Sequence, residues 1–394
     1  MNTVEADLSG AGTAVIESNA SPPARFVELD ALRGLAALMV VFYHFAFETK
    51  VYHQGHSKLI ILLRPFIAGH EAVILFFLLS GFVLSLSTWK GRVIPYPQYL
   101  VRRACRIYLP YLAALALAVC ACFVSHHVLL TPGWAARSWP LPITTASIVQ
   151  HIAFIGDYNN TQYNGAFWSL VVEMRLSLVF PGVLFVLVRM RSRAALLSAA
   201  AISTLAVAMI LLYPASSWTR YRGGLYTVHY LAFFIVGALL ARRLSSLPWP
   251  RLSDSVRHAM VVLSILLFAY GARVLRIAPH WGSGPVEMMT DWIIALGGVG
   301  LIYLAATHHT VKRTLGHFIP RYLGHISYSV YLVHNVVLSW LLILFHNRLS
   351  ITWVFPFYIV LTIGAASLFY YTVELPAMRL GRRLTQSASR PLSA

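Results

Sequence analysis

Long apolar segments separated by short polar ones run through most of the chain. A membrane-spanning helix needs about 20 predominantly apolar residues, and the hydrophobic pattern predicts ten such helices. Their expected limits are 31–49, 70–89, 105–125, 166–188, 195–213, 226–243, 257–276, 288–307, 325–346 and 352–374. The predicted fold class is therefore all-α, a polytopic membrane helix bundle with about ten transmembrane helices.

The pattern also predicts how the chain is organised around these spans. Residues 1–26 are rich in Ala, Ser, Gly and Pro without an apolar run, which predicts a disordered cytoplasmic tail rather than a signal peptide. The membrane domain is expected over residues 27–376, and residues 377–394 are expected to form a cytoplasmic C-terminal tail. The long polar connection at 126–165 is expected to be an external loop that packs over the bundle.

Composition and charge agree with a membrane protein. The chain is 58% hydrophobic and 11% charged, whereas soluble domains are about 25% charged. Its net charge of +18 comes from basic clusters between apolar segments, which the positive-inside rule explains better than nucleic-acid binding does. Successive loops are alternately rich and poor in Lys and Arg, which predicts that both termini lie in the cytoplasm. The expected location is a bacterial inner (plasma) membrane. Cys105, Cys120 and Cys122 are expected to be buried, reduced thiols, and no metal site is expected.

The first span carries an arginine and a histidine in the stretch LDALRGLAALMVVFYHF. Arg33 and His44 are eleven residues apart, so on a helix they lie about 20° apart on one face and about 16.5 Å apart along the axis. A buried arginine costs at least about 2.5–3.5 kcal/mol on insertion scales, which makes such a residue a functional candidate. Arg33 could bind an anion and His44 could act as a general base. The alternative is a snorkelling arginine and a hydrogen-bonded packing histidine.

Six short segments resemble motifs of the acyltransferase-3 family of membrane acyltransferases, and they occur in the family's order. They are Arg33 to His44 for R-X10-H, LFFLLSGFVLS at 75–85, RRACRIYLP at 102–110, FWSLVVEMRLSLVFP at 167–181, ISYSVYLVH at 326–334 and VELP at 373–376. Ile74 replaces an aspartate that is frequent in the family, and Leu176 and Ser177 replace an aromatic pair. These departures bear on the substrate more than on family membership. The chain is expected to be a stand-alone enzyme without an appended esterase-like domain.

The resemblance implies an enzyme that moves an acyl group, most often acetyl, from cytoplasmic acyl-CoA to a hydroxyl. The implied acceptor is a glycan such as an exopolysaccharide, an O-antigen or a lipid-linked precursor. The implied partners are therefore acyl-CoA as donor substrate, a carbohydrate or glycolipid acceptor and membrane lipid, with no permanently bound cofactor. A transporter or flippase that uses the same charged face is the alternative, although no internal repeat of the kind common in transporters is evident.

Within this reading His44 is the general base, and Arg33 binds the phosphate or pantetheine part of the donor or orients its thioester. Arg103 and Arg106 lie one turn apart at the cytoplasmic end of the third span, which suits a nucleotide phosphate. The alternative is that they have no ligand and are simply the basic residues that the positive-inside rule predicts at a cytoplasmic boundary. Glu173 could pair with a basic group on another helix or help to orient His44, and the alternative is a structural ion pair.

Three further side chains are assigned to substrate binding. Trp168 could line the acceptor channel or anchor the membrane interface. Tyr331 and His334 are three residues apart on one helix face, where they could line the cavity or hydrogen-bond across helices. Glu374, just before Pro376, is expected to end the last helix.

Overall fold

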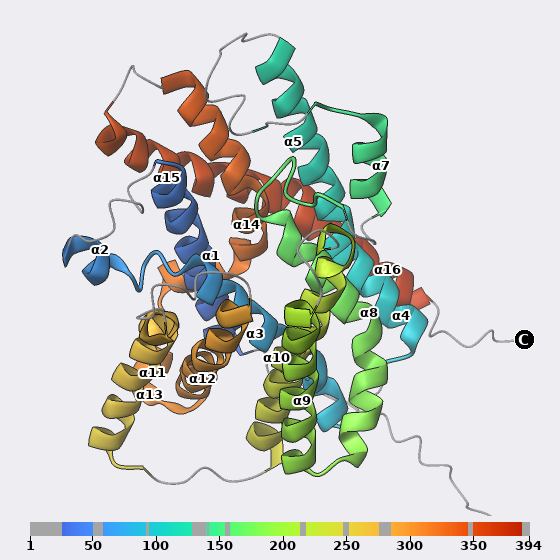
Figure 1. Ribbon diagram of the computed structural model, residues 1–394, viewed down its shortest axis with the longest axis vertical. Coiled ribbons are helices and arrows are strands. Elements are labelled where there is room, and N and C mark those ends of the chain that lie inside the picture. Colours follow the sequence, from blue (N-terminus) through green and yellow to red (C-terminus); the bar gives the residue numbers. More distant parts are fainter. Residues whose placement is uncertain are drawn as a thin grey trace, which may run out of the picture.

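The computed structural model describes residues 26–49, 58–91, 94–127, 139, 142–153, 158–212, 218–246, 252–275, 285–345 and 350–387. In this part of the chain every regular element is helical (Figure 1). Among the described residues, ten helical segments are long and apolar enough to cross a membrane. The all-α class and the polytopic bundle are thus confirmed. Of the expected tail at 1–26, residues 1–25 lie outside the described residues.

Five of the spans carry or frame the polar residues singled out above. They are α1 (Val27–Glu48), α3 (Gly69–Trp89), α5 (Leu109–His127), α8 (Phe167–Arg189) and α14 (Phe318–Phe345). The other long helices are α9 (Ser192–Leu212), α10 (Trp218–Ser246), α11 (Asp254–Leu275), α12 (Pro285–Thr307) and α15 (Ile351–Phe369). The shorter ones are α2 (Lys58–Leu63), α4 (Tyr96–Arg103), α7 (Thr145–Ala153), α13 (His309–Leu315) and α16 (Leu375–Ser387).

Glycines set the contact of α1 with α14. A Cβ added to Gly34 would meet the backbone of Gly324 at 2.5 Å, and one added to Gly324 would meet the backbone of Asp30. Small residues let membrane helices approach this closely and gain dispersion contacts that lipid cannot provide. The contact aligns the first turns of α1 with the first turns of α14, so the two helices run in the same direction through the bundle. His44 and His334 consequently lie at similar depth.

Two π-helical segments interrupt the spans. Ala104–Tyr108 joins α4 to α5, and Tyr370–Glu374 joins α15 to α16. The expectation that Glu374 ends the last helix is wrong, because the helix continues to Ser387. Pro376 occupies the first turn of α16, where the missing N–H and the fixed φ of proline are tolerated. Much of the expected tail at 377–394 is therefore helical.

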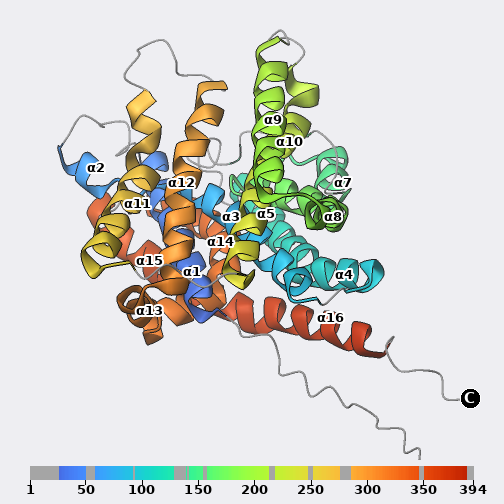
Figure 2. The same cartoon turned by 90° about the horizontal axis from the view of Figure 1, so that it is seen from below.

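Helices α4 and α16 run side by side, across the direction of α9 and α12 (Figure 2). Arg102 Nε donates to Thr385 Oγ1 at 2.9 Å and ties the two together. Both flank the end of the bundle at which α1 begins and α3 ends, here called the entrance end. The cysteines are free thiols, but Cys120 is exposed rather than buried.

The described residues of the predicted external connection contact the 104–108 π-segment and α14. Tyr108 donates a hydrogen bond to Ile152 O of α7 at 2.5 Å, and Asn164 donates to Leu332 O at 2.9 Å. The turn at 158–166 is thereby fixed on α14, at the end of the bundle where α8 begins.

Candidate functional site

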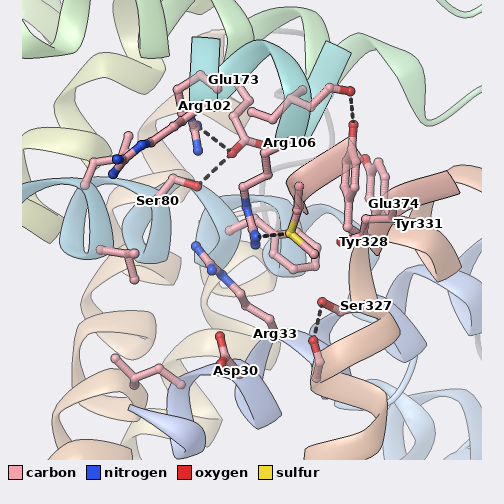
Figure 3. Close-up of a pocket in the computed structure, with 18 of the residues that line it drawn as sticks. Asp30, Arg33, Ser80, Arg102, Arg106, Glu173, Ser327, Tyr328, Tyr331 and Glu374 are labelled. Atoms are coloured by element: carbon pink, nitrogen blue, oxygen red, sulfur yellow. Dashed lines mark hydrogen bonds and ion pairs between the residues drawn. The ribbon is translucent and has the colours of Figure 1, made fainter. Parts of the chain in front are cut away.

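A cavity of about 920 Å³ lies at the entrance end. Its walls come from α1, α3, α4, α8, α14, α16 and the two π-segments at 104–108 and 370–374, and Figure 3 shows several of its side chains. Six basic residues line it, Arg33, Lys90, Arg102, Arg103, Arg106 and Arg382, against three acidic ones, Asp30, Glu173 and Glu374. The excess of cations in a low-dielectric wall favours an anionic ligand.

Glu173 is paired with Arg103 across two helices. Arg103 Nη2 lies 3.3 Å from Glu173 Oε1 and donates to Ser177 Oγ at 2.5 Å, while Ser80 donates to the same Glu173 oxygen at 3.0 Å. Glu173 therefore has the partner on another helix that the sequence allowed for, and it does not contact His44. Arg103 Nε is buried without a hydrogen-bond partner in the described chain, which is costly unless a ligand supplies an acceptor.

Arg33 points into the cavity rather than along the helix toward the membrane surface. Its guanidinium and that of Arg106 are directed into the same space from opposite walls (Figure 3). Arg106 donates to Met378 Sδ at 3.1 Å, whereas Arg33 makes no hydrogen bond with any described residue. Two like charges facing one space repel each other, so an anion between them would lower the energy of both.

His44 lies beyond the inner end of this cavity and pairs with His334. His334 is fully buried, and its Nδ1 lies 2.8 Å from Tyr331 O, so Nδ1–H donates there and Nε2 accepts. His44 Nδ1 lies 3.3 Å from His334 Nε2 and 2.9 Å from Val40 O. Both neighbours of His44 Nδ1 are acceptors, which places the proton of the neutral ring on Nδ1. The lone pair of His44 is then on Nε2, as a general base requires.

Tyr331 connects the cavity to the histidine pair. It lines the inner end of the cavity, and its hydroxyl lies 2.6 Å from Ser169 Oγ. Its ring lies 5.8 Å from the ring of His334, one turn further along α14. His334 does not line the cavity itself, and its Nε2 contacts His44. Trp168 does not line the cavity; it is half-buried, with its ring 6.0 Å from that of Tyr230.

The structure brings Arg33, Arg103, Arg106, Glu173 and Tyr331 to one cavity, with His44 and His334 next to its inner end. Sequence reasoning missed other members of the wall, among them Lys90, Arg102, Arg382 and Ser80. The sequence contains the basic residues of α16, but it does not show that α16 packs against α4. Only this packing brings Arg382 to the cavity.

Comparison with known proteins bears directly on this arrangement. A family model described as an acyltransferase domain, that of acyltransferase-3, matches residues 26–371 and so includes each predicted site residue. The chain belongs to the acyltransferase-3 family. Together with the ten apolar helices of the described residues, this shows an integral membrane protein of that family.

A curated relative adds a partial match. The chain is 36% identical over 116 residues to "Protein 2 in picA locus" of Rhizobium radiobacter, a match that covers 28% of this chain. The chain spans about half (53%) of the length of that relative. No solved structure matches the chain.

Proposed function

We propose that this acyltransferase moves an acetyl group from cytoplasmic acyl-CoA to a hydroxyl of a cell-envelope glycan. The proposal rests on one observation, the arginine-lined cavity whose inner end at Tyr331 adjoins the His44–His334 pair. A membrane acyltransferase needs a place for an anionic donor and a base for a hydroxyl nucleophile, and this arrangement supplies both. The proposed setting is a bacterial inner membrane with both termini in the cytoplasm.

The donor would enter at the entrance end with its phosphates among the arginines. Charge-assisted hydrogen bonds from Arg103, Arg106 and Arg33 suit phosphate oxygens. The cavity follows α3 from Lys90 to Val73, which is about 25 Å at 1.5 Å per residue. A long, narrow donor such as acyl-CoA fits a space of this shape, with its thioester at the inner end and its nucleotide at the entrance.

The distance between Arg33 and His44 along the axis of α1 indicates that the two residues have different roles. Because about 16.5 Å separates them along α1, Arg33 holds the phosphate or pantetheine part of the donor while His44 serves the reacting group. His44 Nε2 takes the proton of the acceptor hydroxyl as its oxygen bonds to the thioester carbon. The C–S bond then breaks, and the proton passes to the sulfur, which leaves as the CoA thiol. General base catalysis of this kind contributes about 10²- to 10⁴-fold.

Radiolabelled acetyl-CoA tests the proposal in membrane vesicles that contain the protein. The wild type should transfer label to envelope carbohydrate and should bind acetyl-CoA in calorimetry. His44→Ala should lose transfer by about 10²- to 10⁴-fold while it binds acetyl-CoA as the wild type does. Absence of both binding and transfer in folded wild type would contradict the proposal and favour transport.

A further inference from the structure

Gly165 faces His44 from the turn that precedes α8. Gly165 is exposed, and a Cβ added there would lie 3.3 Å from Asn335 Nδ2 and 3.9 Å from His44 Nε2. Its backbone does not require glycine, since the positive φ among the described glycines is at Gly91. What glycine provides at position 165 is therefore space next to the lone pair of His44, open to the surface.

The surrounding contacts hold this space in place. Asn164 is buried, and its Oδ1 accepts from Ala166 N at 2.9 Å and from Asn335 Nδ2 at 3.1 Å. The Tyr331 hydroxyl donates to Ala166 O at 3.2 Å. Gly165 thus sits between two residues that are each bonded to α14, the helix that carries His334 and Asn335.

The two nitrogens that face the space suit a hydroxyl group. Asn335 Nδ2 has two N–H donors and gives one of them to Asn164, so the second is available. A hydroxyl oxygen in the space beside Gly165 could accept from Asn335 Nδ2 and donate its proton to His44 Nε2. That is the hydrogen-bond pattern needed for deprotonation of an alcohol by His44.

We propose that Gly165 and Asn335 form the binding site of the acceptor hydroxyl, reached from the end of the bundle opposite to the entrance of the donor cavity. This inference rests on the proposed function, since it takes His44 as the base. Gly165 faces His44, which lies one turn before the end of α1 at Glu48, whereas the donor cavity is lined at α1 only from Phe26 to Arg33. The acceptor class is an alcohol, such as a sugar hydroxyl, that approaches on the far side of the membrane from acyl-CoA.

A steric test uses Gly165→Val with Gly182→Val as the matched control. Gly182 is an exposed glycine of α8 with nothing within 4 Å of an added Cβ. Gly165→Val should lower the rate of transfer to envelope carbohydrate by about 100-fold, the scale of a 1 Å misplacement in an active site. Acetyl-CoA affinity should stay at the wild-type value, which also shows that the variant is folded. Gly165→Ala should have a smaller effect in the same direction, and Gly182→Val should have none.

Asn335→Ala tests the polar contact separately. Loss of one hydrogen bond to the acceptor should lower transfer by about tenfold, again without weakening acetyl-CoA binding. If the wild type transfers acetyl while Gly165→Val and Asn335→Ala both do so at the wild-type rate, the acceptor site is refuted and the proposed function stands. If the wild type neither binds acetyl-CoA nor transfers it, the proposed function itself fails.

Cysteine labelling tests the approach direction without any acceptor. In a background with Cys105, Cys120 and Cys122 replaced by alanine, Gly165→Cys and Ser87→Cys are exposed to a membrane-impermeant maleimide in sealed cells, before and after permeabilisation. Ser87 lines the donor cavity. The two should be labelled from opposite sides, and acetyl-CoA should protect Ser87→Cys alone. Labelling of both from one side would overturn the proposal.

Discussion

Among the ionisable side chains inside the described part of this bundle, two groups differ in how completely the protein satisfies them. In the Asp291 cluster, His70 Nε2 lies 2.7 Å from one Asp291 oxygen and His229 Nε2 lies 3.2 Å from the other. His229 Nδ1 lies 2.9 Å from Ser203 Oγ, which also accepts from Trp292 Nε1 at 2.9 Å. The cluster joins α3, α9, α10 and α12, and Asp291 is buried.

In the arginine group of the donor cavity, by comparison, several hydrogen-bond donors have no acceptor in the described chain. Arg103 Nε has no acceptor in the described chain, and Arg33 makes no hydrogen bond there. Charges in an apolar interior are tolerated when they are paired and hydrogen-bonded, and they are costly otherwise. Both groups are charged, so charge alone does not distinguish a ligand site from a structural network. The difference is that the ligand site has hydrogen-bond donors without an acceptor in the described chain. We therefore expect substitutions in the two groups to have opposite signatures.

Asp291→Ala should show the largest effect on stability. It leaves two histidines without their shared acceptor inside the bundle, and breaking a buried ionic contact costs about 3–5 kcal/mol. Thermal unfolding in detergent should show a marked loss of stability, and acetyl-CoA affinity should be unchanged in the fraction that stays folded. Asp291→Asn, which keeps the size of the side chain, should lose less. If Asp291→Ala unfolds as the wild type does, the cluster is not a structural network.

Arg103→Ala should mainly reduce donor affinity, and its loss of stability should be smaller than that of Asp291→Ala, because Glu173 is partly exposed and keeps its hydrogen bond from Ser80. Removal of a charge-assisted hydrogen bond of about 1.5–3 kcal/mol should raise the acetyl-CoA dissociation constant by about 10- to 100-fold in calorimetry. Arg189→Ala is the control, because Arg189 lies exposed at the end of α8 outside the cavity.

A double variant separates this effect from the loss of the Glu173 pair. Arg103→Ala with Glu173→Gln removes the carboxylate charge that the single variant leaves unpaired. The dissociation constant should stay raised in the double variant, since the ligand still lacks its cation. Recovery of wild-type affinity there would show that Arg103 acts only by neutralising Glu173.

The sequence predicted those features that depend on periodicity along one helix. Apolar length predicted the spans, and the angle of about 20° between Arg33 and His44 agrees with a cavity that Arg33 lines and whose inner end adjoins His44. The motif Tyr331 to His334 likewise places one residue on the cavity and the other on His44. In each case the spacing of residues on a single helix carries the information.

Features that depend on packing between helices could not be predicted in this way. The π-segments at 104–108 and 370–374 leave no mark in composition, so Glu374 was read as the end of a helix. Asp291, His70 and His229 are distant in the sequence and meet only because α3, α10 and α12 pack together. Gly165 is one of 24 glycines, and only the fold shows that its missing side chain faces His44.

His334→Ala should have the smallest effect. It tests whether the histidine pair acts in the reaction, as we propose for the cavity arginines, or only supports the structure, as the Asp291 cluster does. His334 Nε2 holds the Nδ1–H of His44, so its loss removes one of two acceptors that orient the base, while Val40 O remains. Transfer should fall by about tenfold, the worth of one hydrogen bond, with acetyl-CoA affinity unchanged. His334→Gln, which can again present an acceptor, should recover part of the rate, whereas a purely packing role would give an unfolding defect that glutamine does not relieve. Measurement of transfer rate, acetyl-CoA affinity and unfolding temperature on the same preparations distinguishes the two roles, because only an orienting residue lowers the rate without changing the other two.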